Sequence, residues 1–210
     1  MDDVVIIGGG IIGVATAYFL SKEGRKVKVI EKDPSYKEAS FPLSLGGFRR
    51  QFFQKENILL GKFARDFIFQ IPELLKTKKN PNPTASMVPN GYLLMFGPEH
   101  AEEQYRALEN HKECGAGTKN IKGSELSKVF SYINDEGIET ATYTDDKSEG
   151  WIDPFMFHGA LKSKATELGA EFIKGEVKEI SEINAKIIIS AAGCWTKKIL
   201  NDIPVIPQKH

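Results

Sequence analysis

A glycine-rich turn between an apolar strand and a helix places the tightest constraint on how this chain folds. Residues 4–7 (VVII) form a continuous apolar run, which is typical of a strand buried on both faces of a sheet. Gly8, Gly10 and Gly13 follow at G-x-G-x-x-G spacing, and a helical pattern then runs over 11–23. A second apolar strand over 27–30 completes a β-α-β unit, whose crossover we expect to be right-handed.

Each position of this turn suits the diphosphate of a dinucleotide. Gly8 allows the tight turn, Gly10 lets the backbone approach a pyrophosphate, and Gly13 lets the helix pack on the strand. The free N–H groups and the dipole at the helix N-terminus then favour a phosphate. The second strand ends at Glu31, whose carboxylate we expect to bind ribose hydroxyls and to disfavour a 2′-phosphate. The alternative is a tight turn without a ligand, which leaves the acid unexplained.

Composition narrows the class of protein. The chain has 210 residues, equal numbers of basic and acidic residues (28 each) and 41% apolar residues, which excludes a disordered chain and gives no reason to expect nucleic acid as a partner. Its two cysteines, Cys114 and Cys194, cannot form a disulfide framework and fit a reducing compartment. No apolar run reaches the roughly 18 residues of a transmembrane helix, and we expect no targeting segment before the first strand.

The titratable residues show no pattern of a metal site or a catalytic group. The four histidines are scattered without metal-ligand spacing, so no metal is predicted. His158 lies one turn into a predicted helix, where a structural role is expected rather than that of a base. We expect Cys194 to be a small buried apolar residue. The catalytic residue stays unknown at this stage.

The order of expected elements places strands with βα crossovers at both ends of the chain. In the first helix we expect Ala15, Phe19 and Leu20 to face inward. The remaining expected elements are a loop over 34–51, an amphipathic helix over 57–75 with Leu60, Phe63, Ala64, Phe67, Ile68 and Ile71 on one face, a strand over 92–96, a helix over 98–114, a short helix capped by Ser124, a strand over 138–143, a helix opened by Asp153 and Pro154, an extended segment over 172–180, and a strand over 186–190. We therefore predict a discontinuous nucleotide-binding domain over 1–50 and 145–210, and an inserted α+β domain over 51–144.

The segment after Glu31 favours FAD over NAD. An NAD domain would continue with further βα units, but here a loop with serines, paired glycines and arginines follows (39–52, ASFPLSLGGFRRQF). Such a loop suits a larger anionic cofactor, although an ordinary surface loop is the alternative. Arg49 or Arg50 could hold a substrate carboxylate, and surface ion pairing is equally open for Arg50.

Four segments in order resemble the D-amino-acid oxidase-like FAD-dependent oxidoreductases. They are the opening β-α-β unit with Glu31; Ala39-Ser40 with Gly46-Gly47-Phe48-Arg49; Gly150-Trp151-Ile152-Asp153-Pro154 with Gly175-Glu176-Val177; and Ala191-Ala192-Gly193-Cys194-Trp195. The resemblance implies an α/β fold, namely a glutathione-reductase-type Rossmann FAD-binding domain with an inserted, incomplete α+β substrate domain. It also implies hydride transfer to flavin from an amine or amino-acid-like substrate.

The resemblance assigns a role to individual residues. Gly8, Gly10 and Gly13 would bind the pyrophosphate, Glu31 the adenosine ribose, Ser40 a phosphate, and Val177 the adenine. The remaining cofactor residues that it implies are Gly46, Gly47 and Arg49 near the flavin ring, and Ala192 and Gly193 flanking the cofactor at a strand end. Because no His or Cys lies in the loop over 40–50, we expect the FAD to be bound non-covalently. Trp195 is expected to pack as a lid.

The resemblance also implies two departures and a second function. The family continues beyond the Ala-Ala-Gly-x-Trp segment, and it has a longer connection than 178–186, so this chain resembles a shortened form with an incomplete flavin site. The shared residues, among them 33–36, 43–47 and 91–94, are most similar to those of a mitochondrial member that assists assembly of respiratory complex I. The alternative function is therefore a weakly catalytic or non-catalytic flavoprotein that contacts complex I assembly intermediates in mitochondria.

Overall fold

The computed structural model describes residues 2–200, which divide into two compact units. The first unit contains 2–46, 71–85 and 153–200, and the second contains 47–70 and 86–152. Residues 71–85, expected in the inserted domain, group with the first unit, and Lys164 Nζ of that unit donates to the Lys76 carbonyl at 2.8 Å. The assignment of one domain to FAD and the other to substrate stays a prediction.

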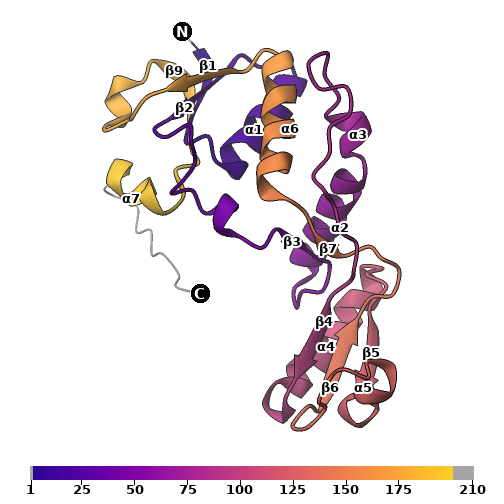
Figure 1. Ribbon diagram of the computed structural model, residues 1–210. Coiled ribbons are helices and arrows are strands. Elements are labelled where there is room, and N and C mark those ends of the chain that lie inside the picture. Colours follow the sequence, from indigo (N-terminus) through magenta and orange to yellow (C-terminus); the bar gives the residue numbers. More distant parts are fainter. Residues whose placement is uncertain (1, 201–210) are drawn as a thin grey trace. The chain divides into compact units, whose positions relative to one another are not determined.

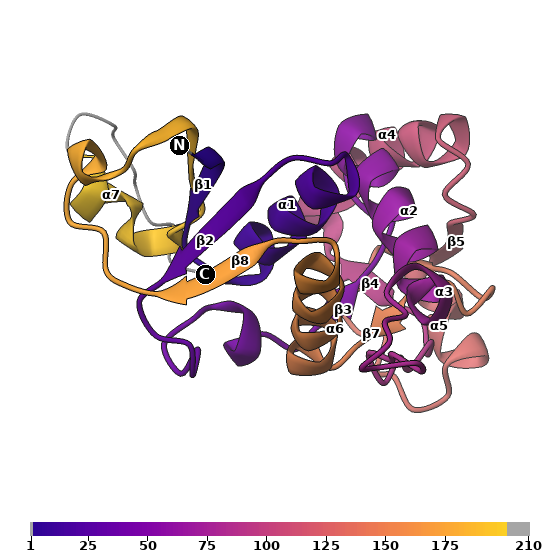
Figure 2. The same ribbon diagram turned by 90° about the horizontal axis from the view of Figure 1, so that it is seen from above.

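The first unit is built on a four-stranded parallel sheet with helices against it (Figures 1 and 2). The strands lie in the order β8 (Glu171–Lys174), β2 (Val27–Glu31), β1 (Asp2–Ile7) and β9 (Ala185–Ser190). All three pairings are parallel. Helices α1 (Ile11–Lys22) and α6 (Pro154–Glu167) lie side by side against this sheet (Figure 1). The predicted α/β fold class is confirmed.

The burial of β1 and α1 explains why the opening residues form a β-α unit. The VVII run of β1 is at most 4% exposed, as expected of a central parallel strand. In α1 the buried residues include Val14, Ala17 and Tyr18, whereas Phe19 is 38% exposed. The inward face predicted for this helix was therefore wrong by about one position, because Gly13 must face the strand and its packing sets the rotation of the helix.

Helix α6 begins where the sequence predicts. The Asp153 side chain caps it by accepting from the Met156 N–H at 2.9 Å, and Pro154 occupies the first turn. Gly169 follows the helix at φ +102°, which only glycine adopts without strain. The other short elements described in this unit are α3 (Ile71–Leu74), α7 (Thr196–Ile199) and 3₁₀ turns at Phe41–Leu43, Ile180–Glu182 and Gly193–Trp195.

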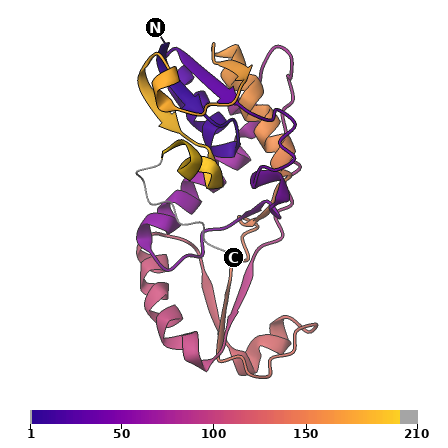
Figure 3. The same cartoon turned by 90° about the vertical axis from the view of Figure 1, so that its left-hand side faces the viewer.

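The second unit is an α+β arrangement around a three-stranded antiparallel sheet. The strands lie in the order β4 (Leu93–Phe96), β6 (Thr140–Tyr143) and β5 (Lys119–Lys122), and β3 (Gly47–Phe48) pairs separately with β7 (Gly150–Trp151). Its helices are α2 (Lys55–Phe69), α4 (Pro98–Glu113) and α5 (Gly123–Val129). Figure 3 shows α4 running beside the strands in pink. Ile121, Leu126 and Ala141 form a core cluster in which no residue exceeds 9% exposure.

Three local predictions for the middle of the chain were wrong. The helix expected over 57–75 is two helices, because Pro72 lacks an N–H and the chain changes units after Gln70. On α2 the expected apolar face is largely exposed, with Leu60 at 65%. Ser124 does not cap α5, since the N-cap is Lys122. No helix within the described range 2–200 is both long and apolar enough to cross a membrane.

Candidate functional site

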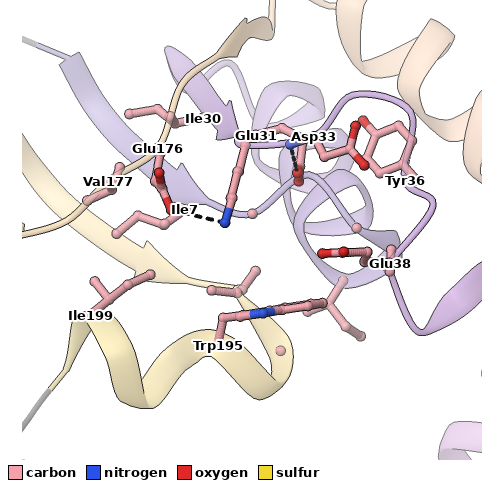
Figure 4. A pocket seen from close by; sticks show the side chains of 18 of the residues that line it. Ile7, Ile30, Glu31, Asp33, Tyr36, Glu38, Glu176, Val177, Trp195 and Ile199 are labelled. Carbon is pink, nitrogen blue, oxygen red and sulfur yellow. Dashed lines mark hydrogen bonds and ion pairs between the residues drawn. The ribbon is translucent and has the colours of Figure 1, made fainter.

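A cavity of about 430 Å³ lies at the carboxyl edge of the parallel sheet, wholly within the first unit. It opens where the chain order reverses: from β1 the sheet continues to β2 on one side and to the much later β9 on the other. Ligands of open α/β sheets bind in a crevice at such a point. In Figure 4, Ile7, Ile30, Val177 and Ile199 gather on one side of the hollow, with Tyr36 and Glu38 on the other.

Seven of the residues predicted from the sequence to bind cofactor line this cavity. They are Gly8, Gly10, Glu31, Ser40, Val177, Ala192 and Gly193. Gly13 and Gly46 belong to the first unit but do not line the cavity, and Gly47 and Arg49 belong to the second unit. The roles proposed for these residues toward a cofactor stay predictions.

The three glycines of the turn differ in what surrounds them. Gly8 has φ +100°, and a Cβ there would lie 2.6 Å from the Ala191 carbonyl oxygen. A Cβ at Gly13 would overlap the Gly8 carbonyl oxygen. By contrast, a Cβ at Gly10 would meet no heavy atom of the described chain within 4 Å. Gly8 and Gly13 are therefore needed for the fold itself, whereas Gly10 borders open space.

The N-terminus of α1 faces this space without a side-chain cap. Gly10 is the N-cap residue in an extended conformation, and no described side chain caps it. The first helical bond runs from the Val14 N–H to the Gly10 carbonyl at 2.9 Å. The N–H groups before Val14 have no acceptor within the helix, and the first turn contains no acidic residue. This end of the helix can receive an anion.

Glu31 holds its carboxylate in a fixed position on the cavity wall. Oε2 accepts from the Gly9 N–H at 2.6 Å. Oε1 accepts from the Asp33 N–H at 2.7 Å, which is the contact drawn in Figure 4. An ionised carboxylate offers about four acceptor positions, so both oxygens keep capacity for further donors such as ribose hydroxyls. The carboxylate thus fixes the glycine turn and borders the cavity at once.

His158 supports the same turn from α6. Its Nε2 lies 2.8 Å from the Gly9 carbonyl oxygen, and its ring stacks on Phe41 with centroids 4.5 Å apart. The side chain is 3% exposed. Burial lowers the pKa of His158, against the opposing effect of its hydrogen bond to Gly9. The histidine is therefore neutral near pH 7 and donates from Nε2, which confirms the structural role expected from the sequence.

Tyr36 is a cavity residue that the sequence did not single out. It lines the cavity at φ +56°, and its hydroxyl accepts from Lys162 Nζ at 3.1 Å. The expectation for Cys194 was wrong, because this side chain is exposed: it lies in the 3₁₀ turn Gly193–Trp195, where Trp195 rather than Cys194 borders the cavity. Within 2–200 no three His, Cys, Asp or Glu residues cluster as metal ligands.

A buried polar cluster in the second unit also lacked a signal in the sequence. Glu149 is 0% exposed and accepts from the Arg50 N–H at 2.6 Å, from Gln51 Nε2 at 2.8 Å and from Thr144 Oγ1 at 2.9 Å. The Arg50 side chain is 9% exposed and forms an ion pair with Asp146 at 2.9 Å, so the ion pairing left open for Arg50 is found, but with a buried arginine that is not free for a substrate. These residues come from segments about a hundred positions apart, which spacing alone cannot bring together.

Within this cluster Arg50 and Asp146 form an ion pair, whereas the donors to Glu149 are uncharged groups. Burial opposes ionisation of Asp146, but hydrogen bonds from Ser148 and Arg50 hold its carboxyl pKa below the ordinary value. Arg49 instead lies over aromatic rings, 5.0 Å from the centroid of Phe52 and 5.9 Å from that of Tyr92. Its guanidinium is thereby oriented by cation–π contacts rather than by a carboxylate.

Comparison with known proteins agrees with this geometry. The family model described as FAD dependent oxidoreductase (DAO) matches residues 3–210. The chain is similar to FAD-dependent oxidoreductase domain-containing protein 1 of Xenopus laevis, with 38% identity over 94% of this chain and 47% of the relative. The protein of the same name in Bos taurus is 32% identical over 94% of this chain and 48% of the relative.

A solved structure supports the same relationship. L-proline dehydrogenase from P. horikoshii aligns with a TM-score of 0.77 and 26% identity, over 95% of this chain and 55% of that chain. The family resemblance expected from the sequence is confirmed. The chain spans about half the length of the curated relatives that it matches.

Proposed function

The chain belongs to the FAD dependent oxidoreductase (DAO) family, and on that premise we propose that its cavity binds the adenosine diphosphate portion of FAD for the oxidation of an amine or amino-acid-like substrate. One observation carries the proposal. The uncapped N-terminus of α1 and the fixed carboxylate of Glu31 border the same cavity at the point where the sheet order reverses. The positive end of the helix suits the negatively charged diphosphate, and the carboxylate beside it can accept hydrogen bonds from the ribose hydroxyls.

The described residues fit this group. The space beside Gly10 is open to a phosphate, since no atom lies within 4 Å of where its Cβ would be. Ser40 borders the cavity and offers a hydroxyl donor. The aliphatic side chains Ile7, Ile30 and Val177 form a wall that suits an adenine (Figure 4). We propose non-covalent binding, because the loop over 40–50 contains no His or Cys for a covalent link.

The protein's own part in the reaction is binding and orientation. A bound flavin supplies the redox chemistry, which in this proposal is acceptance of a hydride from the carbon next to an amine nitrogen. The residues of the first unit hold the dinucleotide by its phosphates and ribose. For the second unit, Gly47 and Arg49 stay proposed as residues near the flavin ring. Ala192 and Gly193 stay proposed as flanking the cofactor.

Binding and reduction of FAD test this function in two steps. The purified chain is incubated with FAD, separated from free flavin by gel filtration, and precipitated with acid. We expect about one FAD per chain that is released into the acid supernatant. The loaded protein is then mixed anaerobically with sarcosine, dimethylglycine, L-proline and D-amino acids, and bleaching by one of them supports oxidation of that substrate. A chain that retains no flavin contradicts the proposal, and flavin that stays with the precipitate contradicts non-covalent binding.

The second candidate is a flavoprotein with little or no turnover that assists assembly of respiratory complex I in mitochondria. It rests on the similarity to FAD-dependent oxidoreductase domain-containing protein 1, which is named for its domain and not for a reaction. FAD binding without bleaching by any amine, together with specific retention of complex I intermediates from mitochondrial extract, favours this candidate. Bleaching without retention favours the enzyme.

A further inference from the structure

Gly9 occupies the variable second position of the glycine turn, yet it is held on three sides. Its N–H donates to Glu31 Oε2 at 2.6 Å, and its carbonyl accepts from His158 Nε2 at 2.8 Å. A Cβ on Gly9 would lie 3.3 Å from the Tyr36 hydroxyl. Gly9 does not line the cavity, yet it is fixed by side chains from β2, α6 and the loop after β2.

Because a peptide group is planar, the contact between His158 and the Gly9 carbonyl also fixes the direction of the Gly10 N–H. The Gly9 carbonyl and the Gly10 N–H belong to one peptide group, and the described chain contains no cis peptide bond. In a trans peptide these two bonds point in opposite directions. Since the carbonyl points to His158, the Gly10 N–H points away from it. Gly10 lines the cavity, so this N–H is available to an acceptor there.

The neighbouring peptide behaves in the same way. The Gly8 carbonyl and the Gly9 N–H belong to one peptide group. The N–H points to Glu31, and the carbonyl oxygen points to Gly13, where an added Cβ would overlap it. Both peptides of the turn are thus anchored by groups outside it. The Gly9–Gly10 peptide is held by His158, a side chain 149 positions away in the sequence.

The setting of His158 makes it a firm anchor. Its ring is stacked on Phe41, with an interplanar angle of 15°, and meets Tyr36 edge-on at 4.5 Å. Burial lowers its pKa, so the imidazole carries a single proton, and the hydrogen bond to Gly9 requires that proton on Nε2. A donor on the Gly9 carbonyl also polarises the peptide and strengthens its N–H as a donor in a low-dielectric setting.

We propose that His158 is a positioning residue for a phosphate group, because it aims the Gly10 N–H into the cavity where the diphosphate of an adenine dinucleotide binds. This inference rests on the proposed function and assigns to that site a residue outside the glycine motif. His158 touches no phosphate and acts through the Gly9–Gly10 peptide.

Comparison of two ligands in two variants separates positioning from general stability. The dissociation constants of ADP and adenosine are measured by ligand-observed NMR for the wild-type chain, His158→Phe and His158→Gln. Phenylalanine keeps the ring packing without a donor, and glutamine restores an N–H donor. We expect His158→Phe to weaken ADP by about 3- to 10-fold and adenosine by less than about twofold, with His158→Gln recovering most of the ADP affinity.

The results that would overturn the positioning role of His158 are distinct from those that would contradict the cofactor site. An equal loss for both ligands, or unchanged ADP affinity in His158→Phe, overturns the positioning role while leaving the cofactor site intact. A wild-type chain that binds neither ligand contradicts the proposed function and this inference with it. If His158→Phe does not fold, the wild-type chain still tests the claim: the Gly10 amide proton resonance must move downfield with ADP and stay in place with adenosine. A Gly10 resonance unaffected by ADP overturns it.

Discussion

The carboxylate of Glu31 stabilises the turn and forms the cavity wall through the same two oxygens. Gly9 and Asp33 each donate a backbone N–H to it, one to each oxygen. Because both oxygens accept, only a carboxylate satisfies both donors, and an amide would direct its NH₂ group at one of them. The identity of this residue is thereby dictated before any ribose is bound.

Glu31→Gln is expected to weaken binding of both ADP and adenosine by about tenfold, since it removes a charged acceptor and misdirects one contact. Isothermal titration or ligand-observed NMR measures the effect. The matched control is Glu176→Gln, which also borders the cavity but is half-exposed and pairs with Lys32 at 3.1 Å. Equal effects of the two substitutions would show that Glu31 has no special part in binding. The ratio of ADP to adenosine affinity distinguishes this variant from His158→Phe.

The two buried histidines predict loss of stability in mild acid. Burial lowers the pKa of His158 and of His111, each against a hydrogen bond to a backbone carbonyl. The unfolded chain takes up these protons near the ordinary value of 6.5, where the folded chain does not. Stability is therefore fully present above about pH 6.5 and falls as the pH drops below it.

Urea unfolding at about pH 7.5 and about pH 5.5 measures this effect, and the midpoint is expected to be lower in acid. The lower pH stays above the range in which carboxyl groups such as Asp33 contribute, since hydrogen bonds from Ser35 hold the pKa of Asp33 below its ordinary value of 3.8. His158→Gln should reduce the difference between the two midpoints. A difference that persists undiminished in this variant would exclude His158 as a cause.

Glu149 is a buried acceptor on which we expect the stability of the second unit to depend. Glu149→Ala would leave the Arg50 N–H, Gln51 Nε2 and Thr144 Oγ1 without their buried acceptor, at a cost of about 2–4 kcal/mol in the free energy of unfolding. Chemical denaturation measures it. Glu109→Ala on the exposed side of α4 is the control and should change stability by less than about 0.5 kcal/mol. Similar losses in both variants would mean that the buried acceptor contributes little.

At the scale of elements, the first β-α turn separates glycines needed for folding from one needed for binding. Gly13→Ala places a Cβ against the Gly8 carbonyl and should cost about 1–3 kcal/mol of stability. Gly10→Ala enters open space and should change stability by less than about 1 kcal/mol. Its Cβ nevertheless occupies the region assigned to phosphate, so ADP affinity should fall at least about tenfold.

Thermal unfolding and ADP titration of these two variants check the distinction. The opposite pattern, in which Gly10→Ala destabilises the chain and leaves ADP binding unchanged, would place the phosphate elsewhere. Both variants lie within one turn of the same helix, so each serves as the control for the other.

The elements predicted best from the sequence are those whose burial follows a simple period. The VVII run and the capped helix after Asp153 show their strand and helix directly. Strand β5 reads KNIK and has one buried residue, so it had no visible pattern and forms only because β6 pairs with it. The face predicted for α2 was wrong in part: Ile68 is buried as expected, but Leu60 is exposed and Ile58, which was not predicted, is buried instead.

Candidate site residues follow the same division. Gly8, Gly10 and Glu31 belong to one local motif and were found from spacing alone. His158 and Tyr36 reach the turn through tertiary packing, over 149 positions in the case of His158, and no local pattern marks them. Sequence reasoning therefore finds the groups that would touch a cofactor more readily than those that hold these groups in place.

At the scale of the whole molecule, the two units offer different chemistry. The first unit contains the parallel sheet and the whole cavity, and the second contains a buried polar cluster around Glu149 and a cation–π pair at Arg49. A ligand that binds only the native state raises the melting temperature. FAD should therefore stabilise the first unit directly, and ADP should reproduce most of that stabilisation.

The most direct measurement is an ADP titration of the isotope-labelled chain followed by its amide resonances. We predict saturable binding of one ADP per chain, with the largest shifts at Gly8, Gly10 and Glu31 and small shifts in the antiparallel sheet of the second unit. Absence of saturation at millimolar ADP, or shifts that leave the glycine turn unaffected, would contradict a cofactor site at the carboxyl edge of the parallel sheet.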